Sequence, residues 1–134
     1  REILELIKKY PNTYLVHWYS ADHDLDGYLD LDCYFSVGPD VIWNPIVQEV
    51  ARVVRPERIL VETDGMEAVK WAFDEGERIA SEREDDSFLN LALPESVRAS
   101  LSQTVQKTAE LRGCDPEVLR AQSVKNFSDY LQET

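Results

Sequence analysis

Three short segments rich in β-branched and aromatic residues, each followed by residues at helical spacing, constrain the fold of this chain most strongly. They are residues 13–19 (TYLVHWY), 33–38 (CYFSVG) and 58–64 (RILVETD). Segments that are apolar on both faces and end in turn residues are typical of buried strands. Strands that alternate with helices form a parallel sheet covered by helices. The order of segments therefore predicts an α/β fold.

The remaining segments predict helices and one charged connection. The 134 residues suit a single domain over 1–134. Residues 74–90 are mostly charged and predict an exposed loop or a surface helix. The predicted helices are residues 1–10, a short turn around Leu25, Tyr28 and Leu29, a helix capped by Asn44 before Pro45, Met66–Phe73, a helix from Pro94 to Gly113, and a last helix capped by Asp115 before Pro116.

Composition excludes several classes of function. The formal net charge is −12, whereas a protein that holds nucleic acid by charge alone normally carries a basic patch. A metal-dependent hydrolase is not excluded, because a cation can supply the attraction. No apolar run approaches the ~20 residues of a membrane span. Cys33 and Cys114 form no zinc-binding pattern, and two cysteines make no disulfide framework. We therefore expect a cytoplasmic protein with no membrane partner.

The ends of the predicted strands carry the candidate chemistry. Parallel strands present their carboxyl ends at one edge, where α/β proteins place their active sites. The first strand carries His17 and Ser20, the second ends near Ser36, and the third carries Glu62 and Asp64. We expect this edge to gather a histidine and two carboxylates.

Each of these residues also has a structural interpretation. His17 is as readily a core histidine as a functional one, and His23 is expected to be a solvated loop residue. Asp64, just before Gly65, either caps the following helix or binds a cation or takes a proton from water. Glu62 is two residues earlier, so on a strand both carboxylates point to the same side. Two such carboxylates are costly without a cation or a donor, which favours function.

One aromatic residue is a candidate for contact with a substrate. Most aromatic residues near the strand ends are expected in the core. Trp43 follows Gly38-Pro39 in a predicted loop and is the best candidate for a ring that faces a substrate.

The motifs LVHWYS, CYFSVGPDV and RILVETDG, in this order, resemble those of the TatD-like metal-dependent hydrolases (TatD-type DNases). The segment VQKTAELRGCDPEVLRAQSVKNFSDYL, with its pair Asn126-Phe127, is similar to the last two helices of that family. The resemblance implies an amidohydrolase-type (β/α)8 barrel that binds one or two divalent metal ions and hydrolyses phosphodiesters, chiefly in DNA.

The resemblance also implies roles for individual residues. His17 corresponds to a metal ligand of the family. Asp64 corresponds to a metal-site and catalytic residue that orients or deprotonates the attacking water. Glu62 is expected in a supporting role. Ser20 and Ser36 are expected to make outer or substrate contacts.

This chain departs from the family pattern in three places. Ser20 is followed by Ala21-Asp22-His23 instead of glycine, and GMEAVKWAFDEGERIASEREDDS replaces a proline-rich stretch after the third strand. The family's His-x-His pair and its later Glu and His are not found, since the chain has two histidines in all. We therefore expect this chain to represent the C-terminal three or so βα units of a barrel whose N-terminal half is absent. We expect the chain to be inactive alone.

The resulting functional prediction is a deoxyribonuclease that uses Mg²⁺, Mn²⁺ or Zn²⁺, with DNA as its substrate. A hydrolase of the same superfamily acting on an ester, lactone or amide is the first alternative, because loops determine the substrate. A non-catalytic barrel scaffold is the second. The sequence leaves the metal, DNA against RNA, the oligomeric state and the role of residues 66–93 open.

Overall fold

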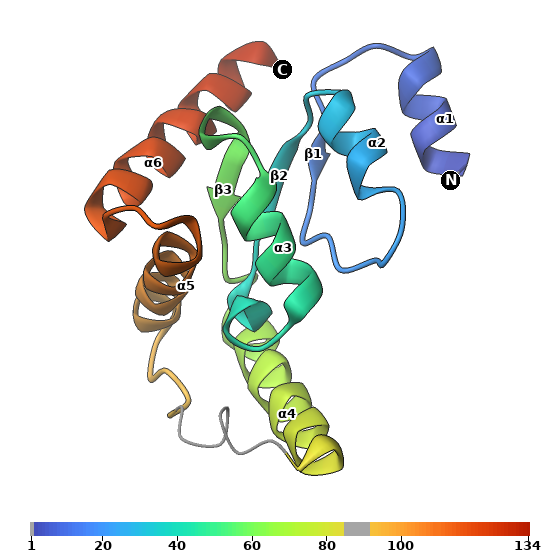
Figure 1. The fold of residues 1–134 in the computed structure, drawn as a ribbon. Coiled ribbons are helices and arrows are strands. Elements are labelled where there is room, and N and C mark those ends of the chain that lie inside the picture. Colours follow the sequence, from blue (N-terminus) through green and yellow to red (C-terminus); the bar gives the residue numbers. More distant parts are fainter. Residues whose placement is uncertain (1, 85–91) are drawn as a thin grey trace.

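A parallel three-stranded sheet lies at the centre of the computed structural model, which describes residues 2–84 and 92–134 (Figure 1). The strands are β1 (Leu15–Val16), β2 (Tyr34–Val37) and β3 (Ile59–Val61), in the order β1-β2-β3. Leu15 is opposite Tyr34, and Phe35 is opposite Ile59. The predicted α/β class with parallel strands is confirmed.

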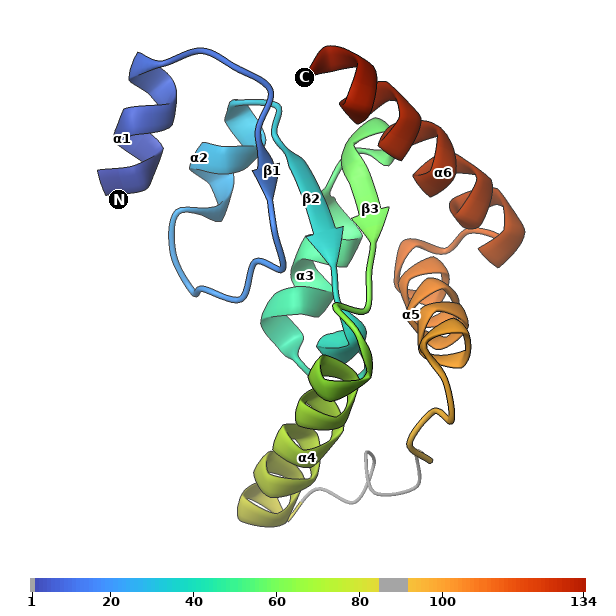
Figure 2. The same ribbon diagram turned by 180° about the vertical axis from the view of Figure 1, so that it is seen from behind.

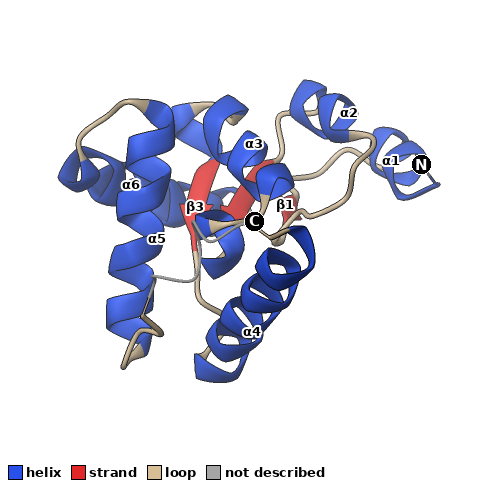
Figure 3. Cartoon of the chain, turned by 60° about the horizontal axis from the view of Figure 1, so that its bottom comes forward, coloured by secondary structure: helices blue, strands red, loops and turns tan. Residues whose placement is uncertain are grey.

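Helices connect and surround these strands, as the view in Figure 3 shows. In chain order they are α1 (Glu2–Lys9), α2 (Leu25–Asp30), the 3-10 turn η1 (Pro39–Ile42), α3 (Pro45–Val53), the 3-10 turn η2 (Pro56–Arg58), α4 (Met66–Arg83), α5 (Val97–Arg112) and α6 (Pro116–Glu133). None of the helices in residues 2–84 and 92–134 is both long and apolar enough to cross a membrane.

Local capping signals account for the helix ends that the sequence predicts correctly. The Asn44 side chain accepts a hydrogen bond from the backbone N–H of Ile46, and Asp115 accepts two at the start of α6. Gly113 ends α5 with a φ of 66°, a left-handed conformation that glycine adopts without a steric penalty.

Four predicted boundaries are wrong, and one of them is the end of the third strand, which lies at Val61 instead of residue 64. The first strand is β1, two residues long, so His17 follows it instead of lying inside it. α4 runs to Arg83, since Arg78 pairs with Glu75 and Glu82 at helical spacing and supports the charged stretch as helix. α5 begins at Val97, because Ser96 is its N-cap and accepts from the N–H of Ala99. The rest of the predicted charged loop, residues 85–91, lies outside the described residues.

The main hydrophobic core lies between the sheet and α3, and α5 and α6 add Val105, Ala109 and Leu119 to it. Phe35 and Val37 on β2 pack in one cluster with Val47 and Val50 on α3, and all four are almost completely buried. Side chains alternate along a strand, so Ser36 belongs to the opposite face of β2. The sheet therefore has one face covered by α3, while its other face carries polar groups toward the strand ends.

Helix α6 lies along the outer side of β3 (Figures 1 and 2). The fully buried Asn126 donates hydrogen bonds from Nδ2 to the carbonyl oxygens of Pro56 (2.7 Å) and Ile59 (2.8 Å). The Oγ of Ser123 accepts from the N–H of Val61 at 3.3 Å. α6 thus satisfies backbone groups on the side of β3 where no other strand pairs with it in the described part of the chain.

Replacing Asn126 with alanine should destabilise the protein strongly. The substitution removes the donor to the buried carbonyl oxygen of Ile59 and to the part-buried carbonyl oxygen of Pro56, and leaving a buried acceptor unsatisfied costs about 1–3 kcal/mol. We expect the free energy of unfolding, measured by urea denaturation, to fall by about 2–4 kcal/mol. Lys125→Ala, which removes an exposed ion pair on the same helix, should change it by less than about 1 kcal/mol. Equal losses for the two variants would contradict the assigned role of Asn126.

Candidate metal centre

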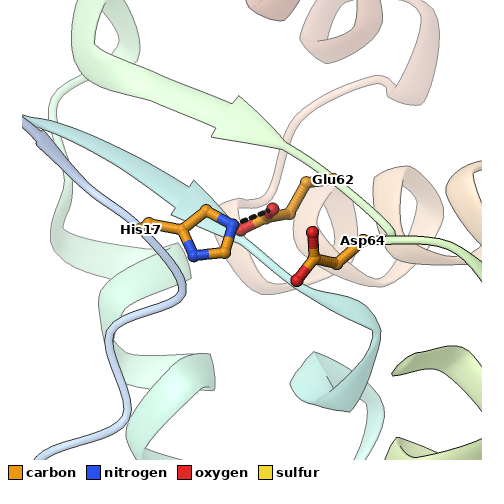
Figure 4. A group of neighbouring side chains, drawn as sticks. All are labelled: His17, Glu62 and Asp64. Atoms are coloured by element: carbon orange, nitrogen blue, oxygen red, sulfur yellow. Dashed lines mark ion pairs between the residues drawn. The ribbon is translucent and has the colours of Figure 1, made fainter. Parts of the chain in front are cut away.

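Three side chains converge at the carboxyl ends of the outer strands (Figure 4). His17 directly follows β1, and Glu62 and Asp64 follow β3. One ligand atom from each lies within 4.8 Å of the others. The Nε2 of His17 lies 2.6 Å from a carboxylate oxygen of Glu62. The structure therefore brings together the histidine and both carboxylates that the sequence places at this edge.

The backbone after β3 brings Asp64 toward His17. β3 ends at Val61, so Glu62 and Asp64 are not strand neighbours, and the predicted strand alternation is the wrong reason for their proximity. Asp64 has a φ of 58°, in the left-handed region that Asp tolerates better than most residues. Gly65 is the N-cap of α4, and no side-chain cap bond is made there, so Asp64 is not a helix cap.

The hydroxyl of Ser36 connects the two sides of this site. Its Oγ donates to Oε1 of Glu62 at 2.5 Å and accepts from the backbone N–H of Trp18 at 3.1 Å. The side chain is 4% exposed. Ser36 therefore fixes one oxygen of Glu62 and leaves the other oxygen next to His17. The chain beside His17 is held by the same hydroxyl.

The convergent donors fit a divalent cation. An imidazole nitrogen and two carboxylates are ligands that Zn²⁺ and Mn²⁺ accept, and carboxylates suit Mg²⁺. Two atoms bonded to one ion lie at most about 4–4.5 Å apart, twice the usual ligand distance of about 2.0–2.2 Å. The 4.8 Å spacing is close to that limit, so small side-chain rotations would allow one ion to contact all three.

The indole ring of Trp18 is a part of the site that the sequence did not indicate. Its Nε1 donates to a carboxylate oxygen of Asp40 at 2.6 Å, and its ring packs against Gly38. Trp18 has a φ of 45°, a strained conformation for a bulky residue that surrounding contacts must maintain. Asp40 is 1% exposed, and burial raises the pKa of its carboxyl group, although hydrogen bonds from Asn44 and Trp18 act in the opposite direction.

The other sequence candidates lie outside the convergent group. Ser20 is exposed and lines a hollow beside His17. His23 is exposed and contacts the neighbouring Asp22, in agreement with a solvated loop histidine. Trp43 is partly buried and donates from Nε1 to the carbonyl oxygen of Ala72 at 2.8 Å. No sequence signal pointed to Asp40 or Trp18, because their contacts depend on the fold.

Replacing Gly38 with alanine should disturb the site through Trp18. An added Cβ would lie 2.5 Å from Cε2 of the Trp18 ring, closer than real contacts allow. The ring is held by Asp40, so we expect a loss of about 1–3 kcal/mol in the free energy of unfolding. In a Trp18→Ala background the same change should cost much less, and a double-mutant cycle measures this coupling. Additive losses would show that the contact is not responsible.

Comparison with known proteins supplies the family. A search of curated proteins found no match. The family model described as TatD related DNase matches residues 1–132 of this chain. The match includes all three strands and the residues that follow them. With nearly the whole sequence covered, the chain belongs to the TatD related DNase family.

Proposed function

We propose that this protein is a divalent-metal-dependent deoxyribonuclease that cleaves phosphodiester bonds. Family membership supports a metal-dependent hydrolase. The observation that carries the proposal is the convergence of His17, Glu62 and Asp64 within 4.8 Å at the carboxyl ends of parallel strands. The net charge of −12 is compatible with a polyanionic substrate if a cation is bound at that site.

Each site residue has a distinct role in this proposal. His17 and Asp64 would hold the cation, and Glu62 would support them through its contact with His17. A bound divalent cation supplies Lewis-acid polarisation of the phosphoryl oxygen. The exposed Asp64 carboxylate orients the attacking water and accepts its proton. Ser36 keeps Glu62 oriented, and Ser20 is placed to contact the substrate.

The wider setting of the domain stays a prediction. We propose that the three βα units over residues 1–134 belong to an amidohydrolase-type barrel, as its C-terminal part. The resemblance implies further ligands, a His-x-His pair followed by a Glu and a His on earlier strands, and this sequence contains no His-x-His pair. Activity is therefore best tested on the product of the complete reading frame, and residues 1–134 alone should be inactive. Two free cysteines, Cys33 and Cys114, support a cytoplasmic location.

Nuclease assays with Mg²⁺, Mn²⁺ or Zn²⁺ test the proposed activity. We expect hydrolysis of single- and double-stranded DNA to require a metal and to stop with EDTA. The rate should fall about 100-fold or more in Asp64→Asn, because the amide cannot accept a proton. Asp26→Asn, which neutralises an exposed carboxylate on α2, is the matched control and should keep full activity.

Two outcomes would overturn this assignment. An Asp64→Asn variant as active as the Asp26→Asn control would remove Asp64 from the mechanism. Metal-dependent hydrolysis of a lactone, ester or amide, with DNA left intact, would keep the site and replace the substrate.

The role of Ser36 can be tested by metal binding. Ser36→Ala removes the hydrogen bond that orients Glu62, and loss of such supporting contacts typically weakens metal affinity about 10–100-fold. Titration calorimetry with Mn²⁺ measures the change. Ser100→Ala is the control, since Ser100 is fully buried on α5 and its hydroxyl has no hydrogen-bond partner among the described residues. Equal affinities for the two variants would contradict the role of Ser36.

A further inference from the structure

An exposed tryptophan lies close to the candidate metal centre. Trp71, on α4, is 53% exposed, although indole rings are among the side chains that gain most from burial. Its ring centroid is 6.0 Å from that of Trp18, with the ring planes at 79°. Trp18 directly follows His17 in sequence. Trp71 also lies in one of the segments in which this chain departs from the family pattern.

All three tryptophans of the chain line one hollow beside His17. The hollow has a volume of about 540 Å³, and its wall includes Trp18, Trp43 and Trp71. Ligand pockets typically measure about 300–1,000 Å³, so an aromatic ring system fits. The indole N–H groups of Trp18 and Trp43 donate to Asp40 and Ala72, which fixes both rings before any ligand arrives. Trp71 presents the most exposed ring of this wall.

The lining of the hollow offers a ligand aromatic faces and no cationic side chain for an anion. Among the described residues it contains no lysine or arginine. Its carboxylates are already paired, since Glu75 accepts from Arg78 and Asp40 accepts from Trp18 and Asn44. Such a lining suits a flat, neutral ring better than a phosphate group. Nucleobases are rings of this kind, and every base has a π face that can stack on an aromatic side chain.

We propose that this hollow binds an unpaired nucleobase of the DNA strand whose phosphodiester lies at His17, Glu62 and Asp64, with Trp71 as the stacking surface. This inference rests on the proposed function. A base inside a duplex is stacked on its neighbours and cannot enter, so the hollow favours single-stranded or frayed ends. The adjoining positions of His17 and Trp18 place the base site next to the site of hydrolysis.

Binding of two labelled probes tests the proposal without hydrolysis. The first is a single-stranded oligo(dT), and the second is an abasic strand of the same length, both with uncharged methylphosphonate linkages that the chain of net charge −12 does not repel. Fluorescence anisotropy in EDTA gives the Kd of each. We expect the wild-type protein to bind oligo(dT) roughly tenfold more tightly, since stacking of one base on an aromatic ring contributes affinity of this order. Trp71→Ala should abolish that difference, and Trp71→Phe should restore most of it.

Phe127→Ala is the matched control. Phe127 is 54% exposed, close to the value for Trp71, but it lies on α6 and lines a different hollow. It should leave the preference for oligo(dT) unchanged. Circular dichroism confirms that all variants are folded.

The failure of this inference is distinct from the failure of the proposed function. Equal affinity of the wild type for both probes, no binding of either, or equal effects of Trp71→Ala and Phe127→Ala would overturn the base site. DNA hydrolysis dependent on metal and Asp64 would survive such a result. Preferential oligo(dT) binding that depends on Trp71, in a protein that cleaves only a lactone or amide, would overturn the nuclease and keep the base site.

Discussion

The hydroxyl of Ser36 holds the carboxyl ends of all three strands in one arrangement. From the end of β2 it donates to Glu62 after β3 and accepts from the backbone of Trp18 after β1. These two hydrogen bonds link segments that otherwise belong to separate turns. The position of His17, which precedes Trp18, and the orientation of the Glu62 carboxylate therefore depend on one buried side chain. Trp18 also lines the hollow beside His17. The Ser36 hydroxyl therefore supports both the candidate metal centre and this hollow.

Much of the fold could be predicted because its signals are local. Apolar β-branched segments identify β2 and β3, and the pairs Asn44-Pro45 and Asp115-Pro116 mark two helix starts within one residue. The length of α4 was not predicted, because its buried face continues after Phe73 only through the small residues Gly76 and Ala80, which give a weak apolar signal among many charged residues. The shortness of β1 also depends on tertiary context, as Trp18 leaves the strand conformation to reach Asp40.

The candidate site likewise has parts that the sequence predicts and parts that depend on the tertiary fold. His17, Glu62 and Asp64 could be placed together because parallel strands end at one edge. The backbone path that brings Asp64 toward His17 could not be predicted. It requires a left-handed conformation at Asp64, and the neighbouring residues do not indicate one. The contact of Trp18 with Gly38 joins residues twenty positions apart, and the exposure of Trp71 depends on how α4 leaves the sheet. Trp43, the ring that the sequence favoured, has its indole N–H occupied by Ala72.

The attachment of α6 to β3 imposes an order on events during synthesis. The backbone groups of Pro56, Ile59 and Val61 are satisfied by side chains that lie 62 to 70 residues later in the chain. At translation rates of about 5–20 residues per second, roughly 3–14 seconds separate the two segments. During that interval the outer side of β3 is an unprotected strand edge, which can pair with other chains. Each newly made chain is therefore prone to aggregation through this edge until Asn126 has been synthesised and has bound the carbonyl oxygens of Pro56 and Ile59.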